Sequence, residues 1–297
     1  MSGLTQREIA SQPQLWRRAA ALVDSVGDDL PRPGERVCFI GCGTSLYISQ
    51  AAAALREAQG YGEADAFPAS EVPLERDYDL AVAVSRSGTT TELLEVVRGL
   101  QPEVPVLALT ADAESPLGVL AARVVELPFA DEGSVVQTRF ATCVLALLRA
   151  SLGVEVEAVA LDGERALRLD PPVDVQSIRQ LVFLGSGWSV GLASEAGLKV
   201  REAAQAWSEA YPAMEYRHGP ISVAQPGTVV WALSALPAGL AGEISFTGAA
   251  LVEGSLDPMA ELVRVQRLAV ALAQARGLDP DQPRNLSRSV VLSSDAG

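Results

Sequence analysis

Short apolar runs alternate along the first half of the chain with longer segments of helical period. The runs typical of buried strands are Val37–Ile40, Leu80–Ser85, Val104–Leu109 and Arg123–Leu127. Helical stretches follow three of them, at Ser45–Gln59, Thr90–Leu100 and Ser134–Leu152. This alternation predicts βαβ units, so we expect an α/β fold with a parallel sheet covered by helices.

The second half of the chain begins with the same pattern as the first. VCFIGCGTS (Val37–Ser45) and LVFLGSGWS (Leu181–Ser189) align without a gap at an offset of 144 residues. Internal duplication is the simplest account. The alternative is that any two doubly wound domains open with an apolar strand and a glycine-containing turn.

A weaker helical segment, Glu155–Leu169, leads through two prolines to the second repeat, so the domain boundary is expected between residues 150 and 178. We predict two doubly wound parallel-sheet domains. Residues 1–153 form the first, with an N-terminal helix, and residues 154–297 the second. Between the strand Val229–Leu233 and the last helix, Asp257–Arg276, only residues 235–256 remain. A full βαβ unit needs roughly 30 residues, so we expect the second domain to be abbreviated.

Composition and charge exclude several functions. The net charge of −14 repels a polyanion, so no nucleic-acid partner is expected. The longest apolar stretch, Thr228–Val252, is interrupted by proline, glycine and glutamate, so no membrane span is expected. The start, MSGLTQREIA, lacks the features of a signal peptide, and a cytoplasmic location is expected. Three cysteines without a CxxC pair and one histidine argue against a metal site.

The first glycine turn, GCGTS at Gly41–Ser45, lies where a strand leads into a helix. Backbone N–H groups and hydroxyls at a helix start suit an anion. A dinucleotide fingerprint would need glycine where Leu46 stands, and no P-loop sequence occurs. Taken alone, the turn is better explained by a serine that caps the helix.

The next strand ends in an unusual concentration of polar residues, SRSGTT at Ser85–Thr90. Capping a helix needs one hydroxyl, whereas this segment supplies four and an arginine. Together with Ser45 they would surround a phosphate at the carboxyl edge of the sheet, which we favour over a simple polar loop. SALPAG (Ser234–Gly239) offers one hydroxyl at the corresponding place, so one phosphate site is expected, in the first domain.

A helix of the second half carries Glu195, Lys199 and Glu202 at i, i+4 and i+7, on one face. The alternative is a solvated Glu–Lys surface pair. The sole histidine, His218, follows shortly after this helix. A carboxylate and an imidazole can open a sugar ring and move a proton between adjacent carbons, because both steps are acid–base transfers.

These segments resemble, in order, those of the double sugar isomerase (SIS) domain proteins. The matching stretches are GCGTS, SRSGTT, EGSVVQTRF (Glu132–Phe140), SEAGLKVRE (Ser194–Glu202), SEAYPAMEYRHGP (Ser208–Pro220) and DQPRNLSRSV (Asp281–Val290). The chain is similar to the isomerase half of glucosamine-6-phosphate synthase and to phosphosugar isomerases and deaminases.

The resemblance implies a role for each matching residue. The sugar-phosphate cradle corresponds to Ser45, Ser85, Arg86, Ser87 and Thr90, and positions near the sugar correspond to Val135 and Gln137. It assigns Glu202 as the proton-shuttling base and His218 as the ring-opening group, with Glu195 and Lys199 on the supporting helix face. It also implies a homodimer, because the family's histidine reaches the site from the partner subunit.

Three features depart from the family, and the first is the shortened segment 235–256, which forms part of one expected pocket wall. No glutaminase domain precedes residue 1, so glutamine-dependent synthesis of an amino sugar is not expected. Arg288 stands where the family has a lysine that forms an imine with a keto-sugar, and a guanidinium cannot do so. Arg288 is therefore expected to hydrogen-bond the sugar or the tail.

The leading expectation is an aldose–ketose isomerase or amino-sugar deaminase that acts on a hexose 6-phosphate through an enediol or enolamine, without a cofactor. A non-catalytic phosphosugar sensor is the competing hypothesis, although no helix-turn-helix segment accompanies the domains. A third hypothesis, a nicotinamide-dependent oxidoreductase, has no support in the sequence besides the glycine turns.

Overall fold

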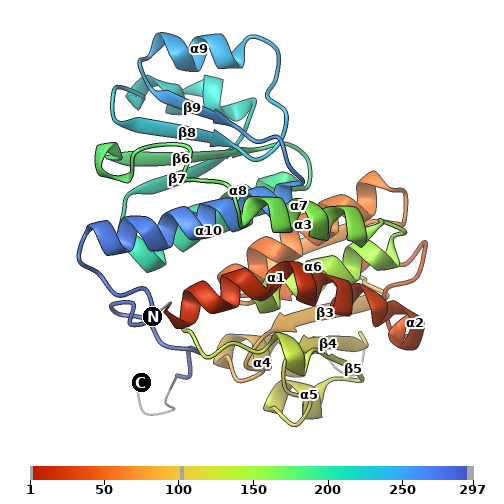
Figure 1. The fold of residues 1–297 in the computed structure, drawn as a ribbon. Helices are drawn as coiled ribbons and strands as arrows, with labels where there is room; N and C mark the ends of the chain where they lie inside the picture. Colours follow the sequence, from red (N-terminus) through yellow and green to blue (C-terminus); the bar gives the residue numbers. More distant parts are fainter. Residues whose placement is uncertain (1–2, 101–103, 293–297) are drawn as a thin grey trace. The chain divides into compact units, whose positions relative to one another are not determined.

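The structure is a computed structural model that describes residues 3–100 and 104–292. Its described residues form two compact units, each built on one parallel sheet. The sheet A unit contains residues 14–156 and 287–292, and the sheet B unit contains residues 3–13 and 157–286. Figure 1 labels most of their helices and strands.

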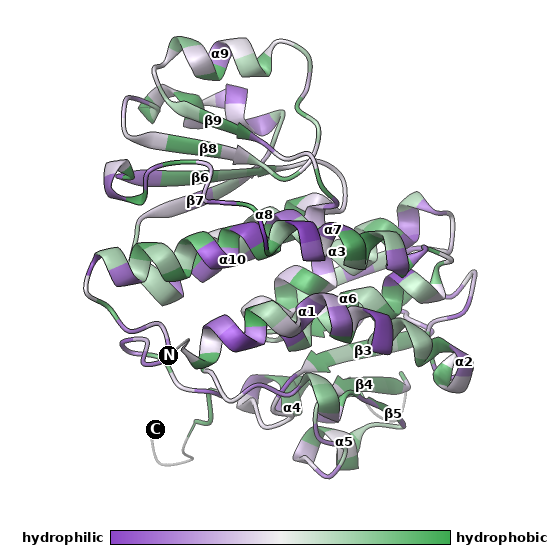
Figure 2. Ribbon diagram, viewed as in Figure 1, coloured by the Kyte–Doolittle hydropathy of each residue, from purple (hydrophilic) through white to green (hydrophobic). Residues whose placement is uncertain are grey.

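Sheet A has five strands among the described residues. Their order is β2 (Ala64–Pro68), β1 (Val37–Gly41), β3 (Leu80–Ser85), β4 (Val106–Thr110) and β5 (Arg123–Glu126), with every neighbouring pair parallel. The inner strands β1, β3 and β4 are buried along their whole length, as continuous apolar runs in a parallel sheet should be. Figure 2 shows β3 and β4 largely in the green of hydrophobic residues. The four strands predicted in this half are confirmed to within two residues.

Helices cover both faces of sheet A (Figure 1). One face carries α3 (Thr44–Ala58) and α6 (Arg139–Ser151), and the other carries α4 (Thr91–Leu100) and α5 (Pro116–Leu120). Leucines and valines of α4 pack on alternate residues of the central strands, such as Ile40 and Ala83. The helix predicted from Ser134 begins only at Arg139, because residues 134–138 form a loop held by Glu132.

Sheet B has four described strands, in the order β7 (Ser208–Pro212), β6 (Gln180–Gly185), β8 (Thr228–Ala232) and β9 (Ala250–Glu253), again all parallel. The helices α8 (Ser189–Ala204) and α10 (Pro258–Ala275) pack against each other, and α9 (Leu240–Phe246) packs on a core with Tyr216. The short segment 235–256 thus contains a helix and a strand, α9 and β9. The segment is short because its helix has only seven residues.

The described residues contain three further helices. They are α1 (Leu4–Ala21), α2 (Val23–Val26) and α7 (Val156–Ala166), with 3-10 turns at Ala69–Glu71, Pro128–Ala130, Val175–Ser177, Glu215–His218 and Pro220–Val223. Within the sheet A unit, the buried Trp16 on α1 donates its indole N–H to Oγ1 of Thr142, at 2.8 Å. None of the described helices combines the length and apolar character that a membrane crossing requires.

The two units differ from the predicted domains at both ends of the chain. The main division falls after Val156, and the first described residues belong to the sheet B unit. There the carboxylate of Asp281 accepts hydrogen bonds from the backbone N–H groups of Leu4 and Thr5, both at 2.7 Å, and from the Thr5 hydroxyl. Although burial raises the pKa of Asp281, these hydrogen bonds hold it below its usual value. Residues 287–292 belong to the sheet A unit instead.

Candidate functional site

A polar cavity lies at the carboxyl ends of β1 and β3 in the sheet A unit. Its volume is about 30 Å³. It is lined by Cys42, Ser45, Val84, Ser85, Arg86, Ser87, Thr90, Leu93, Gln137 and Arg288. Seven residues predicted from the sequence therefore share one cavity, at the edge of the sheet where such folds bind ligands.

The loop from β3 to α4 is shaped by hydrogen bonds between its own residues. The Ser85 hydroxyl accepts from the backbone N–H of Gly88 at 3.1 Å, and the Ser87 hydroxyl accepts from the N–H of Thr89 at 3.3 Å. Gly88 has a φ of 61°, a left-handed conformation that favours glycine. The hydroxyls of Ser87 and Thr89 are 3.0 Å apart, so they face the same point.

We expect Gly88→Ala to reduce the free energy of unfolding by about 2–5 kcal/mol. A Cβ at this position would lie 2.5 Å from Cβ of Ser115 and nearer still to its Oγ, which caps α5. Chemical denaturation measures the loss. Gly60→Ala is the matched control, because Gly60 has a φ of 75° and open space around its Cβ position. Equal losses in the two variants would contradict this role for Gly88.

Arg86 ties three segments together beneath the cavity. Its side chain is 1 % exposed. It donates from Nη1 to the Ser134 carbonyl at 2.8 Å and from Nη2 to the Arg288 carbonyl at 3.0 Å. A carboxylate oxygen of Glu132 lies 3.9 Å from Nη1. The guanidinium thus brings positive charge to the cavity wall while holding the surrounding backbone.

Glu132 begins one of the stretches that resemble the SIS proteins, but the sequence predicted no role for its side chain. Its buried carboxylate accepts hydrogen bonds from the backbone N–H groups of Thr138 and Arg139, at 2.6 and 2.7 Å, and so caps α6. Gln137, in the same loop, has a buried side-chain oxygen for which the described residues offer no donor. Val135 is half-buried and is not among the described residues that line the cavity.

Cys42 and Leu93 also line the cavity, and sequence reasoning missed both as site residues. Burial raises the pKa of the Cys42 thiol to about 11. The thiol is therefore protonated at neutral pH and is a poor nucleophile. Arg288 reaches the cavity from the chain's C-terminal part and pairs with Asp131 at 2.5 Å.

The acidic and basic residues of α8 form a compact group within the sheet B unit. Nζ of Lys199 lies 3.3 Å from Oε1 of Glu195 and 2.5 Å from Oε2 of Glu202. The side chains of Glu195 and Lys199 are each 1 % exposed, whereas that of Glu202 is 19 % exposed. The group is therefore buried, unlike the solvated surface pair that the spacing also allowed. Glu202 alone of the three reaches solvent appreciably.

His218 ends a 3-10 turn (Glu215–His218) that follows β7, and its side chain is exposed in the single chain. Gly219, with a φ of 134°, breaks the turn directly after it. His218 and the α8 group belong to the sheet B unit, and none of these residues lines the polar cavity. Among the described residues, no cluster of three His, Cys, Asp or Glu side chains is placed to hold a metal ion.

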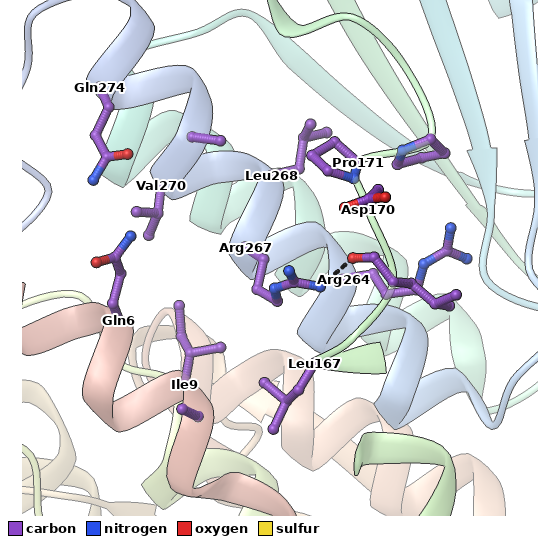
Figure 3. Close-up of a pocket in the computed structure, with 14 residues that line it drawn as sticks. Gln6, Ile9, Leu167, Asp170, Pro171, Arg264, Arg267, Leu268, Val270 and Gln274 are labelled. Carbon is purple, nitrogen blue, oxygen red and sulfur yellow. Dashed lines mark hydrogen bonds between the residues drawn. The ribbon is translucent and has the colours of Figure 1, made fainter. Parts of the chain in front are cut away.

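A larger cavity, of about 380 Å³, lies in the sheet B unit between the start of α1, residues 167–172 and α10 (Figure 3). Two arginines of α10 line this cavity, and both already have partners within the unit. Arg267 donates to the carbonyls of Ala166 and Leu169, at 2.6 and 2.5 Å, and Arg264 pairs with Glu261 at 2.9 Å. No residue predicted to bind sugar lies there, so the smaller, hydroxyl-lined cavity is the better candidate site.

The fold and the hydroxyl-rich strand end define a parallel α/β protein suited to an anionic ligand. Comparison with known proteins makes this class more specific: residues 32–151 match the family model of the SIS domain. This match contains every strand of sheet A and most of the residues that line the polar cavity.

Two curated relatives are named glutamine–fructose-6-phosphate aminotransferase [isomerizing]. The protein from Methanothermobacter thermautotrophicus is 26 % identical over 93 % of this chain, and that from Gloeobacter violaceus is 28 % identical over 96 %. The chain spans about half the length of these relatives, 54 % and 58 %.

Solved structures extend the similarity to the whole chain. Glucosamine-6-phosphate deaminase from Thermotoga maritima superposes with a TM-score of 0.84 at 25 % identity, covering 98 % of this chain and all of that one. Tagatose-6-phosphate ketose/aldose isomerase from Escherichia coli has the same fold, with a TM-score of 0.81 at 19 % identity, covering 96 % of this chain and 97 % of that one.

Proposed function

We propose that this protein is a phosphosugar isomerase or deaminase that binds the phosphate of a hexose 6-phosphate in the sheet A unit. The observation that carries the proposal is the cavity where four hydroxyls and an arginine converge at the carboxyl ends of β1 and β3. Hydroxyl and N–H donors there suit a phosphate, whose charge strengthens each hydrogen bond. The SIS match and the names of the relatives support the same substrate class.

For the chemistry we propose Glu202 as the base. It would take the proton next to the sugar carbonyl and return it to the adjacent carbon, through an enediol or an enolamine. Nζ of Lys199 lies 2.5 Å from Oε2 of Glu202 and so holds that carboxylate in position. Binding energy at the phosphate would hold the reacting carbons in place for this transfer.

His218 is proposed to assist ring opening, contributed from the partner subunit of a homodimer. Its exposed position in the single chain is compatible with that role. The reaction would proceed without an imine, because Arg288 cannot form one and Lys199 is held as an ammonium between two carboxylates. Proton transfer by acid–base groups then suffices for either an isomerase or a deaminase.

A panel of aldose, ketose and 2-amino-sugar 6-phosphates tests this function. Product sugar and released ammonia are followed together, and calorimetry measures binding. Turnover of at least one hexose 6-phosphate is expected. Binding without turnover would favour the sensor hypothesis, and no binding at all would contradict the proposal.

Ser87→Ala is expected to weaken binding of the phosphosugar roughly 10- to 100-fold, because a hydrogen bond to a charged group contributes about 1.5–3 kcal/mol. Calorimetry with fructose 6-phosphate measures the change. Ser25→Ala is the control, since the exposed Ser25 donates only to the Leu22 carbonyl of its own turn among the contacts described. Unchanged affinity in Ser87→Ala would remove Ser87 from the phosphate site.

A further inference from the structure

The larger cavity of the sheet B unit has the size of a small-molecule site. Its volume of about 380 Å³ lies within the range of roughly 300–1,000 Å³ that such sites occupy. A dry cavity of about 150 Å³ already holds benzene. The apolar part of the lining includes Ile9, Leu167, Leu169, Leu268, Val270 and Ala271. An apolar molecule larger than benzene therefore fits in this space.

The polar side chains of this lining do not suit a sugar. No serine or threonine is among the described residues that line it, whereas four hydroxyls line the cavity at β1 and β3. Its polar groups belong instead to Gln6, Asp170, Arg264, Arg267 and Gln274. In Figure 3, Gln6 and Gln274 lie toward one end of the cavity and Asp170 toward the other, with Arg267 between them. A ligand would thus meet a mostly apolar wall with a guanidinium near its middle.

Arg267 is held in place by one nitrogen of its guanidinium. Nη1 donates to the carbonyls of Ala166 and Leu169, at 2.6 and 2.5 Å. Ala166 is the last residue of α7, so its carbonyl has no partner within that helix. In the part of the chain that the structure describes, no acceptor lies within hydrogen-bond distance of Nε or Nη2. A fixed guanidinium therefore keeps two donors for a ligand.

The charges around Arg267 favour an additional anion. Burial lowers the pKa of Arg267, the charge of Asp170 opposes this shift, and the charge of Arg264 adds to it. Arg264 is itself fixed, because Nη1 lies 2.9 Å from Oε2 of Glu261 and Cζ lies 5.0 Å from the centre of the Trp231 ring. Its Nε is buried, and the described residues offer it no acceptor. A carboxylate in the cavity would offset the repulsion between the two guanidiniums.

We propose that this cavity is a second ligand site, which binds a small carboxylate with an apolar body. The carboxylate accepts hydrogen bonds from Nε and Nη2 of Arg267, a parallel pair of donors that suits bidentate binding. The apolar body packs against Ile9, Leu268 and Val270 and supplies most of the affinity. The site goes beyond the proposed function and does not depend on it, because it shares no residue with the polar cavity.

The first test compares hexanoate, 1-hexanol and hexylammonium, which share one apolar body and differ in charge. Calorimetry on the full chain measures each affinity. Hexanoate is expected to bind about 10-fold more tightly than 1-hexanol, because only the carboxylate makes charge-assisted hydrogen bonds with Arg267. Hexylammonium should bind more weakly than either. Equal affinities for hexanoate and 1-hexanol, or no binding of hexanoate, would overturn the proposal.

The same titration in saturating fructose 6-phosphate separates the two sites. The affinity for hexanoate should not change. Competition between the two ligands would place hexanoate in the polar cavity and overturn the proposal. Failure of fructose 6-phosphate itself to bind would contradict the proposed function and leave the carboxylate site standing.

The second test removes the guanidinium. Arg267→Gln is expected to weaken hexanoate binding about 10-fold. The matched control is Arg276→Gln, because Arg276 also donates from Nη1 to two backbone carbonyls, those of Ala204 and Gln205, but does not line the cavity. It should bind hexanoate as the parent does. Thermal unfolding verifies that each variant is folded.

The third test fills the apolar part of the cavity. Ala271→Phe should weaken hexanoate binding more than about 10-fold, since a ring would occupy the space of the apolar body. The control is Ala275→Phe, at an exposed position of the same helix that does not line the cavity. NMR of the parent chain gives a measurement that needs no variant, because the methyl signals of Leu268 and Val270 should shift on titration with hexanoate. Methyl signals that do not move, or parent affinity in both Arg267→Gln and Ala271→Phe, would overturn the assignment.

Discussion

Glu202→Gln is expected to lower the exchange of the carbon-bound proton of a hexose 6-phosphate with deuterated water by roughly 100- to 10,000-fold, the usual contribution of a general base. The amide keeps the shape of the side chain but cannot accept the proton. Binding of the phosphosugar should change little, because the phosphate site is proposed in the sheet A unit. NMR follows the exchange and calorimetry the affinity.

The control is Glu253→Gln, an exposed carboxylate at the end of β9, which should exchange the proton at the parent rate. If Glu202→Gln also exchanges at the parent rate, the base lies elsewhere. A parallel loss of binding and exchange would instead indicate that Glu202 positions the sugar.

Lys199→Met should reduce the free energy of unfolding by about 3–5 kcal/mol. The substitution leaves the Glu195 carboxylate, 1 % exposed, without the ammonium that lies 3.3 Å away. A buried charge that loses its partner is strongly destabilising, whereas a neutral side chain at the same place is tolerated. Urea denaturation at neutral pH measures the loss, and adding Glu195→Gln should recover a large part of it.

Arg165→Met is the matched comparison. Arg165 pairs with Asp162 one helical turn away at 3.0 Å, but its side chain is 66 % exposed. Its removal should cost less than about 1 kcal/mol, since solvent screens such pairs. A loss below about 1 kcal/mol for Lys199→Met as well would mean that the group on α8 does not depend on its ammonium.

The inner strands could be predicted from the sequence because a strand buried on both faces is a continuous apolar run. β1 and β3 were therefore located almost to the residue. The edge strands β2, β7 and β9 escaped prediction, because they are short and partly exposed and contain polar residues or proline. Their positions depend on pairing with a neighbouring strand, which no local pattern records.

The hydroxyl-rich cavity followed from one rule, that parallel strands end at a common edge of the sheet. That rule brought Ser45 together with the loop at residues 85–90. It could not place Ser289, whose hydroxyl lies near those of Ser87 and Thr89 but which is about 200 residues further along the chain and belongs to no periodic segment. Nor could it reveal that the charge of Arg86 faces the buried Glu132, since that contact depends on the loop before α6.

The carboxylate of Asp281, which caps the start of α1, joins residues that are synthesised far apart in time. Thr5 is synthesised 276 positions before its partner Asp281. At about 5–20 residues per second, the two are separated by roughly 14–55 seconds of translation. The sheet A strands, all complete by residue 126, are available to fold during that interval. The sheet B unit, to which both Thr5 and Asp281 belong, is thus completed only after Asp281 is made.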